Sequence, residues 1–346
     1  MIHWTVATFL ATTAAAHELD DPPPSPTVES STVATEDAPT DGDPAPPPPP
    51  DARPDPPALV HDAALRIEQA DYLGARILLN EALETTGPHT EEATYLTGVA
   101  WELGGQVETA IDTYREVMAT WPDGARHDDA EFRLAEATAT LGDLPGAIAR
   151  MEALSTTTDA DALKVGLLLA TWRMELEPSK RTERDLRLVL ATAAEGVATF
   201  YQAKAHIALA TRRVAEAAEL TFDVRDRKQA RRLDKRGVLI LTAEDHVTTA
   251  ARLEEPEWIL EGLLQLGSAY EALGADLLAA KPKRLSETQR AEYDAIIEEK
   301  VDFIWVKAQR HYARGIEMGQ RLRWRSDRLD ELEASKTAIE ARLESL

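Results

Sequence analysis

A pattern that recurs about every 35 residues constrains this chain more than any other feature. In its clearest copy, a small and an aromatic residue are followed by a second small residue, a second aromatic residue and a proline: Gly98, Trp101, Ala110, Tyr114 and Pro122. The apolar residues between them follow the i, i+3, i+4 and i+7 spacing of an amphipathic helix. Because one pair of such helices cannot bury its own apolar face, the pattern predicts stacked helical hairpins.

Similar landmarks lie on both sides of this copy. The preceding copy carries Ala75, Leu79, Ala82 and Pro88, and the following copy carries Leu134, Ala135, Gly142, Ala147 and Met151. The small positions step by 35, 37, 35 and 35 residues through Ala75, Ala110, Ala147, Thr182 and Ala217. Leu263 to Ala279 fits the pattern once more, although Pro282 should shorten its second helix. The only stretch that could form a strand is 237–242, and helix-forming sequence flanks it on both sides.

These landmarks resemble the tetratricopeptide repeat pattern W-x2-L-G-x2-Y…A-x3-F…P. The resemblance covers about Ala58 to Ala280 and is firmest up to Leu154. It implies an all-α fold, a right-handed α-solenoid of tetratricopeptide-like hairpins, with a long-helix extension at the C-terminal end. It also implies a concave groove in which a partner segment binds, lined by first-helix residues: Thr94, Thr97, Glu131 and Arg133.

Gly104 and Gly105 stand where the first helix of a unit gives way to the second. Paired glycines can cradle a phosphate, but a phosphate loop would not recur in every unit, and no lysine follows the pair. The equivalent places hold Ala70-Asp71, Gly142-Asp143 and Gly274-Ala275. The pair therefore predicts a helix end in a conformation that suits glycine.

The N-terminal part of the chain divides into a predicted signal peptide at 1–16 and a proline-rich acidic linker at 17–57. The apolar run Trp4 to Ala16 is too short to span a bilayer and ends in alanines that suit cleavage before His17. A cytoplasmic leader is the alternative, and the lack of Lys or Arg ahead of the run is consistent with a start codon further upstream. The linker is predicted to be a spacer, an inert linker or a ligand for a proline-binding module.

Cysteine is absent from the sequence. This excludes disulfides, thiolate zinc sites, a catalytic thiol and a thioether-linked lipid anchor. Together with the signal peptide, it predicts a periplasmic or otherwise exported protein that is not a lipoprotein. The rest of the chain divides into a repeat array at 58–224, linking helices with a degenerate unit at 225–285, and a C-terminal helical extension at 286–346.

The C-terminal third carries a second set of landmarks, including Trp258, Leu266-Gly267, Tyr270, Tyr293, Tyr312 and Trp324. They resemble the C-terminal region of exported tetratricopeptide proteins of myxobacteria and their relatives, some of which belong to the gliding-motility envelope machinery. That resemblance implies an assembly role in the bacterial envelope. Those gliding proteins are often lipoproteins, and the absence of cysteine departs from that pattern.

Ser286 is a predicted cap for a long helix with apolar positions from Tyr293 to Tyr312. The tail beyond it places Leu329, Leu332, Ile339, Leu343 and Leu346 at heptad a and d positions, with Lys336 at an a position. So few heptads do not make a coiled coil that is stable by itself. They predict either a helix that caps the last repeat or a helix through which two copies form a homodimer.

The net charge of −23 argues against binding to nucleic acid, which is recognised through clustered Lys and Arg. One basic segment, Arg225 to Arg236, stands out against this background. Its Arg231, Arg232, Lys235 and Arg236 would either dock an acidic partner, anionic lipid or cell-wall polymer, or form a solvated helix face. A second basic stretch, Arg310 to Arg328, surrounds Trp324 and has the same two interpretations.

No motif for phosphate-loop, hydrolase, zinc-protease or dinucleotide chemistry occurs in the sequence. His127-Asp128-Asp129 resembles a metal-ligand cluster, but it lies at a predicted helix start, where carboxylates are favoured. No cofactor, metal or catalytic residue is therefore predicted. The sequence favours a non-catalytic scaffold or assembly factor that binds a protein or peptide. A module that homo-oligomerises through its C-terminal helices is the alternative, and an enzyme acting on cell-wall polymer is a more distant one.

Overall fold

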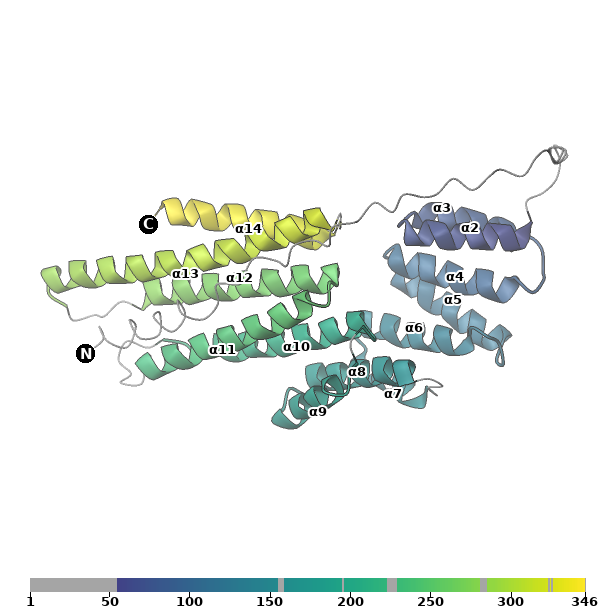
Figure 1. Cartoon of the computed structure of the whole chain (residues 1–346), viewed down its shortest axis with the longest axis horizontal. Coiled ribbons are helices and arrows are strands. Elements are labelled where there is room, and N and C mark those ends of the chain that lie inside the picture. The colour runs from purple at the N-terminus through teal and green to yellow at the C-terminus, as the bar shows by residue number, and fades with distance from the viewer. Residues whose placement is uncertain are drawn as a thin grey trace, which may run out of the picture. The chain divides into compact units, whose positions relative to one another are not determined.

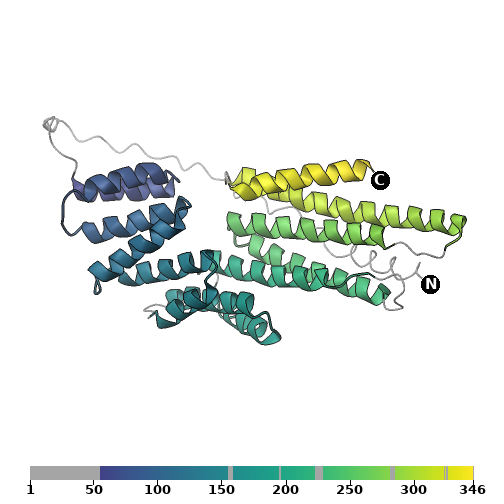
Figure 2. The same ribbon diagram turned by 180° about the vertical axis from the view of Figure 1, so that it is seen from behind.

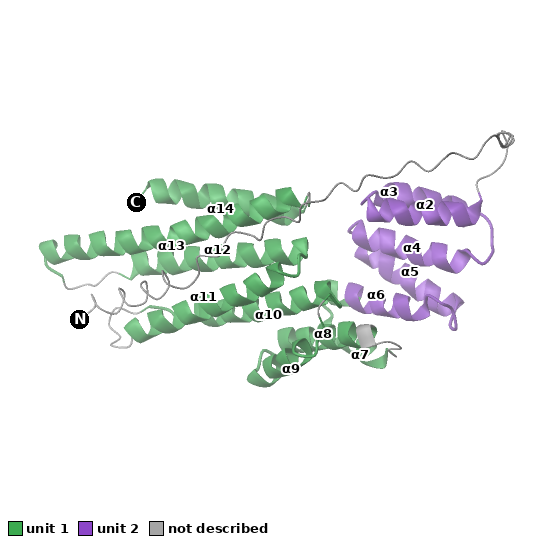
Figure 3. Ribbon diagram, in the orientation of Figure 1, with its two compact units in different colours: residues 1–9, 138–346 green, residues 10–137 purple. Residues whose placement is uncertain are grey.

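The computed structural model describes residues 55–154, 159–194, 196–222, 229–280, 285–322, 324 and 326–345. All regular secondary structure in these ranges is α-helical, including the 237–242 stretch (Figures 1 and 2). The predicted signal peptide and all but the end of the predicted linker lie outside the described residues. The chain divides into two compact units, one ending at Ala137 and one beginning at Thr138, which Figure 3 shows in different colours.

The N-terminal unit consists of two helical hairpins and most of a fifth helix. Its helices are α2 (Pro56–Glu68), α3 (Tyr72–Ala82), α4 (Thr90–Leu103), α5 (Val107–Thr120) and α6 (His127–Thr140). Each hairpin pairs consecutive helices, and α4 also packs on α2 and α3. Side chains of α6 join the apolar cluster between α4 and α5. This is the helical-hairpin stacking that the repeat pattern predicts.

Small residues allow the close approach of paired helices, as predicted. Gly98, Ala110, Ala135 and Ala147 are all buried. A Cβ atom on Gly98 would lie 2.6 Å from the ring of Tyr114, which is itself fully buried. The Tyr114 ring therefore fills the space that a side chain at position 98 would need.

The turns between paired helices confirm the prediction made for the glycine pair. Gly105 and Gly142 have φ angles of 80° and 89°, and Ala70 takes the equivalent place with a φ of 60°. After two of these turns an aspartate caps the next helix: the Asp71 and Asp143 carboxylates each accept a backbone N–H hydrogen bond at 2.9 Å. The glycines thus adopt the left-handed conformation of the turn.

The C-terminal unit contains α7 (Leu144–Ala153), α8 (Asp159–Leu176), α9 (Lys180–Leu190), α10 (Thr199–Ala218), α11 (Gln229–Ala251), α12 (Pro256–Ala279), α13 (Glu287–Arg321) and α14 (Asp327–Glu344). Its main antiparallel pairs are α10 with α11 and α12 with α13, which lie side by side in Figures 1 and 2. The helices α8, α9 and α12 also pack on α10, and α14 packs on both α12 and α13.

Two details of the predicted repeat are wrong in this unit. Ala217 lies at the end of the 20-residue helix α10 instead of on a second helix. The turn expected at Gly274 is absent, because α12 runs unbroken for 24 residues through it. Gly267 and Gly274 instead allow α13 to approach closely, since Cβ atoms there would overlap the rings of Tyr312 and Trp305.

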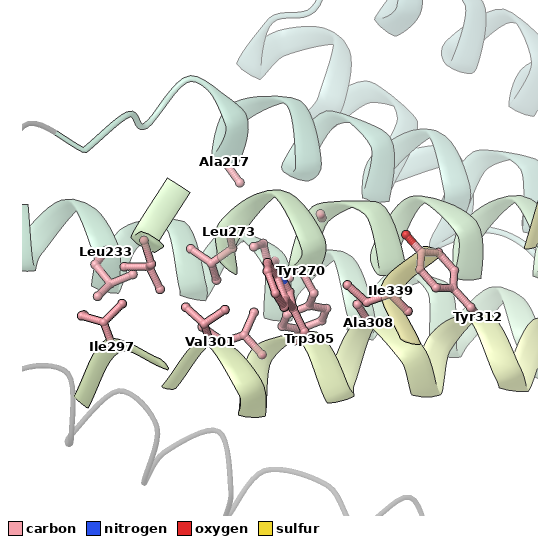
Figure 4. Packing of buried hydrophobic residues seen from close by; sticks show 14 of the residues in the cluster. Ala217, Leu233, Tyr270, Leu273, Ile297, Val301, Trp305, Ala308, Tyr312 and Ile339 are labelled. Atoms are coloured by element: carbon pink, nitrogen blue, oxygen red, sulfur yellow. The ribbon is translucent and has the colours of Figure 1, made fainter. Parts of the chain in front are cut away.

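One apolar cluster of the C-terminal unit lies mainly between α12, α13 and α14 (Figure 4), a second lies between α10, α11 and α12, and a third between α8, α9 and α10. Ser286 caps α13 through a capping box with Gln289, as predicted. The predicted apolar positions of α13 from Ile297 to Tyr312 are buried, and so are Leu332 and Ile339 of α14. The all-α fold of stacked helical hairpins with long C-terminal helices is thus confirmed, and α14 covers α12 and α13 within the same chain.

Candidate functional site

Three of the four residues predicted to line a groove, Thr94, Thr97 and Arg133, form hydrogen bonds or ion pairs with other residues of the N-terminal unit. The Thr94 and Thr97 hydroxyls donate hydrogen bonds of 2.8 Å to backbone carbonyls one turn earlier in α4, and Thr94 is buried. Glu131 and Arg133 are half-buried on α6. Thr94 is therefore buried, whereas Thr97, Glu131 and Arg133 are partly accessible.

Arg133 belongs to a small polar network. Its guanidinium lies 3.5 Å from the Glu102 carboxylate, which also accepts a 2.6 Å hydrogen bond from the Tyr114 hydroxyl. Burial and the neighbouring Glu102 raise the pKa of Tyr114 well above its usual range, so this hydroxyl stays protonated. The network joins α4, α5 and α6 and has an evident structural role.

The predicted basic segment is only partly a surface. Arg225 to Lys228 lie outside the described residues, whereas Arg231 and Lys235 are exposed on α11 and Arg232 is half-buried. Arg236 is 2% exposed: its guanidinium pairs with Asp276 of α12 at 2.5 Å and lies over the Phe222 ring. Arg236 therefore belongs to the interior and does not share a face with Arg231 and Lys235.

A cavity of about 720 Å³ opens in the C-terminal unit between α8, α10, α12 and the start of α14. It is called the tryptophan groove below. Its lining is Glu175, Lys204, Ile207, Ala208, Thr211, Glu257, Trp258, Glu261, Gln265, Trp324, Ser326, Asp327, Arg328 and Glu331. A cavity of this size is in the range that takes up a ligand or a few side chains of a partner.

Lys204 of α10 is held between two aromatic rings at one wall of the groove. Its ammonium lies 5.5 Å from the Trp258 ring centroid and 5.8 Å from that of Trp172, within cation–π range. Trp172 is buried, and Phe200 packs edge-on against Trp258 at 5.4 Å. These contacts fix the position of the Trp258 indole.

Two carboxyl groups, Glu175 of α8 and Glu257 of α12, share this wall with Lys204. Both residues are exposed to solvent, but the surrounding protein partly excludes water and raises the pKa of both groups, and the positive charge of Lys204 opposes that rise. Neither carboxylate has an ion pair of its own among the described residues. An additional positive charge placed beside them would therefore favour their ionised form.

A chain of hydrogen bonds crosses the groove from α10 to α14. Thr211 donates to Gln265 at 2.8 Å, Gln265 donates to Glu261 at 2.7 Å, and Arg328 pairs with Glu261 at 2.7 Å. Arg328 also pairs with Glu331 at 2.6 Å. The guanidinium of Arg328 is thus engaged by two carboxylates of the lining itself.

Two polar atoms of the lining, the Trp258 indole nitrogen and the Ser326 hydroxyl, are buried and lack a hydrogen-bond partner among the described residues. Leaving such groups unpaired is costly, so a partner that supplies an acceptor after a small movement would be favoured. Trp324, by contrast, exposes apolar surface: the residue is 39% exposed at the rim of the groove. The groove therefore combines apolar contact area with unsatisfied polar groups.

The lining is acidic as a whole. Five carboxylates (Glu175, Glu257, Glu261, Asp327 and Glu331) face two cations, Lys204 and Arg328, which gives a formal charge of −3. A ligand that carries positive charge and an apolar or aromatic group matches this lining best.

No motif in the sequence links the residues that line the tryptophan groove. Trp258 and Trp324 stood out only as separate landmarks, and Lys204, Glu175 and Glu257 carried no motif. The lining comes from four helices separated by up to about 150 residues, so no local spacing connects them. In the sequence, the one feature that could have indicated this site is that Trp258 and Trp324 each lie close to an acidic residue, Glu257 and Asp327 respectively.

His127 begins α6, as predicted, and its neighbour Asp129 pairs with Arg126 at 2.7 Å. No group of three or more His, Asp or Glu side chains in the described ranges is arranged to hold a metal ion. Among the helices that the structure describes, none has an apolar stretch long enough to cross a membrane.

Comparison with known proteins adds little to this picture. No protein-family model matches the chain, and no curated protein sequence matches it. A TPR repeats protein from Bacteroides fragilis shares 16% identity over 83% of this chain and 99% of that one, with a TM-score of 0.26. Yeast Tom70 shares 10% identity over 84% of this chain and 95% of its own, also with a TM-score of 0.26. Scores this low carry no functional conclusion, and the fold described above rests on this chain's own helices.

Proposed function

We propose that this chain is a non-catalytic scaffold that binds a basic, partly apolar segment of a partner protein in the tryptophan groove. The observation that carries the proposal is the combination of five carboxylates, two cations and an exposed tryptophan around one cavity. Helical hairpin stacks commonly present extended surfaces of this kind to partner segments.

The acidic lining of the tryptophan groove favours a partner segment that carries positive charge. Arg328 is engaged by Glu261 and Glu331, whereas Glu175 and Glu257 share only Lys204. A lysine or arginine of the partner would supply the missing positive charge, and an adjacent apolar side chain would cover the Trp324 ring. The net charge of −23 would also accelerate the encounter with a basic partner at low ionic strength.

The size of the cavity favours a segment over a whole folded surface. About 720 Å³ accommodates several side chains of an extended or helical peptide. Interfaces of this kind draw most of their affinity from a few aromatic and charged anchors. Trp258 and Trp324 are the aromatic anchors here, and Glu175 and Glu257 are the charged ones.

The place of action that we propose is the bacterial cell envelope. The signal peptide at 1–16 would direct export, and the linker at 17–57 would form a spacer ahead of the helical part. Sequencing of the mature N-terminus tests this: a chain starting at His17 supports export, and a chain that retains residues 1–16 contradicts it.

The alternative of homo-oligomerisation through the C-terminal helices has weaker support. The heptad positions Leu332 and Ile339 are already buried against the same chain. Little apolar surface of α14 is therefore left to drive the pairing of two copies.

A displayed library of random peptides, selected on the full chain, tests the proposed function. We expect selected peptides to combine Lys or Arg with aromatic or aliphatic residues. Their affinity should fall about tenfold or more in the Glu175→Lys/Glu257→Lys variant, because like charges then meet in the groove. It should also fall as the pH drops and these carboxyl groups, whose pKa values are already raised, become protonated.

The matched control is Glu219→Lys/Glu344→Lys, which changes the net charge equally at exposed helix ends outside the groove. Peptides that bind this control as they bind the unmodified chain support the groove. Selection of acidic peptides, or equal loss of affinity in both variants, would contradict the proposal.

A further inference from the structure

A second charged site lies on α9 and α10, apart from the tryptophan groove. Lys180, Glu183, Arg184 and Arg187 follow an i, i+3, i+4, i+7 spacing and therefore share one face of α9. Arg212, Arg213 and Glu216 of α10 face them across a cavity of about 380 Å³. These seven residues are called the arginine cluster below.

Glu183 organises the arginine cluster. Its carboxylate is 11% exposed and is contacted by three guanidinium groups: Arg187 at 3.0 Å, Arg212 at 3.0 Å, and Arg213. Glu216 then pairs with Arg212 at 3.3 Å and with Arg213 at 2.6 Å. The two carboxylates hold Arg212 and Arg213 in fixed positions, although side chains of this length are usually mobile.

The positive charges of the cluster exceed the negative ones. Five cations and two carboxylates give the seven residues a formal charge of +3, within a protein whose net charge is −23, and Asp185, which pairs with Arg184 at 3.4 Å, lowers this to +2. Lys180 has no ion pair with any residue that the structure describes. One guanidinium nitrogen of Arg212, Nη1, is buried without a hydrogen-bond partner among the described residues. Since an unpaired buried donor is costly, the cluster is incomplete without a further acceptor.

The shape of the site narrows the class of ligand. Arg212 and Arg213 are only 13% and 15% exposed at the base, whereas Arg184 and Arg187 are half-exposed or more at the rim. A recess of this kind admits a small tetrahedral oxyanion, which forked guanidinium groups contact with two hydrogen bonds at once. A ligand with a flat surface, such as a folded protein, would contact only the rim residues.

From these contacts we infer that the arginine cluster is a binding site for a phosphate group, carried by a small soluble ligand. Arg184, Arg187 and Lys180 contact the phosphate oxygens from the rim, and Arg212 and Arg213 contact them from the base. This site is independent of the tryptophan groove and does not rest on the function proposed for it.

Calorimetric titration of the full chain with inorganic phosphate tests the inference. We expect saturable binding, together with a phosphate-dependent rise in the unfolding temperature, because a ligand that binds the folded state stabilises it. The Lys180→Gln/Arg184→Gln variant should bind about tenfold more weakly, since it removes two charged contacts. These two side chains are exposed and lie outside the buried Glu183 network, so the variant should fold normally.

Arg181→Gln, which removes one positive charge, is the control, because this residue lies on the same helix, is 85% exposed and does not line the cavity. It should bind phosphate as the unmodified chain does. Vesicles containing phosphatidylglycerol distinguish the source of the phosphate: binding that inorganic phosphate competes away would indicate a lipid headgroup and overturn the small-ligand assignment. No saturable binding of phosphate, or equal binding by the Lys180→Gln/Arg184→Gln variant, would overturn the site itself.

Discussion

The turns from α2 to α3, from α4 to α5 and from α6 to α7 each contain one residue with a positive φ angle. Gly105 and Gly142 take this conformation without steric cost, whereas Ala70 takes it with a Cβ atom present. A Cβ on Gly105 would touch nothing within 4 Å, so a substitution there changes only the backbone energy. The role of this residue was predictable from sequence, because the turn recurs in neighbouring units.

The first prediction concerns Gly105→Ala. We expect it to lower the free energy of unfolding by about 1 kcal/mol, since alanine is strained at a φ of 80°. Gly105→Asn should lose less, because asparagine tolerates the left-handed region. Urea titration of both variants measures the difference, and an alanine variant as stable as the unmodified chain would contradict the proposed turn.

His311 on α13 is a buried group that makes stability depend on pH. Its side chain is 12% exposed, stacks on Tyr270 of α12 and lies 3.8 Å from Glu244 of α11. Burial, Lys307 and Arg314 lower its pKa to about 4, although Glu244 acts in the opposite direction. The imidazole is therefore neutral in the folded chain at pH values where the unfolded chain already binds a proton.

The second prediction follows from that sign. As pH falls from 7 to 5, the unfolded state gains a proton at position 311 and the folded state does not, so the free energy of unfolding decreases. The contribution of His311 is on the order of 1 to 2 kcal/mol by pH 5. His311→Gln should reduce the measured pH dependence by that amount, and an unchanged dependence would contradict the assignment. The pKa of His246 is also lowered to about 4, so the free energy of unfolding of the His311→Gln variant should still depend on pH in part.

At the scale of helices, the sequence predicted boundaries that depend on local signals better than positions that depend on contacts between distant residues. Prolines at 88 and 122, the turn positions Ala70-Asp71 and Gly142-Asp143, and the cap at Ser286 are local signals, and each marks a real helix boundary. Gly274 gave the same local signal but lies inside α12. Its role comes from the Trp305 ring on α13, a contact between distant residues that no local pattern contains.

The third prediction distinguishes the two roles predicted for α14, which are to cover neighbouring helices of the same chain or to pair two copies in a homodimer. If this helix covers α12 and α13 within one chain, Ile339→Ala should lower the free energy of unfolding by about 2 to 4 kcal/mol at every protein concentration. The exposed Glu333→Ala serves as the control and should change stability little. Stability that rises with protein concentration in the unmodified chain, and no longer does so in Ile339→Ala, would instead indicate a dimer seam.

The tryptophan groove also shows why a site can escape sequence analysis. Each of its residues has an ordinary role on its own helix: Lys204, Glu175 and Glu257 would be read as solvated positions. Their chemistry arises only when α8, α10, α12 and α14 come together. By contrast, Arg236 was predicted as a surface residue because its neighbours are basic, and its buried pair with Asp276 depends on a residue 40 positions away.

At the scale of the whole molecule, an acidic chain with an acidic groove should bind basic partners in a salt-dependent manner. The fourth prediction is that the affinity of a selected basic peptide falls as salt concentration rises. The phosphate site should lose affinity with salt as well, but its ligand carries the opposite charge. Because the groove and the arginine cluster share no lining residue, reversal of charge in the groove should not weaken phosphate binding, which titration of the Glu175→Lys/Glu257→Lys variant with phosphate can check.

The most direct test of the central claim is site-specific photo-crosslinking of a selected basic peptide to the full chain. The photoreactive residue would replace Ala208 in the groove, Thr97 on the predicted concave face of α4, or the exposed Leu188 on α9 as a control. We predict crosslinks from position 208 alone, lost when Glu175 and Glu257 are changed to lysine. Equal crosslinking from all three positions, or crosslinking from position 97 in place of 208, would contradict the assignment of the tryptophan groove.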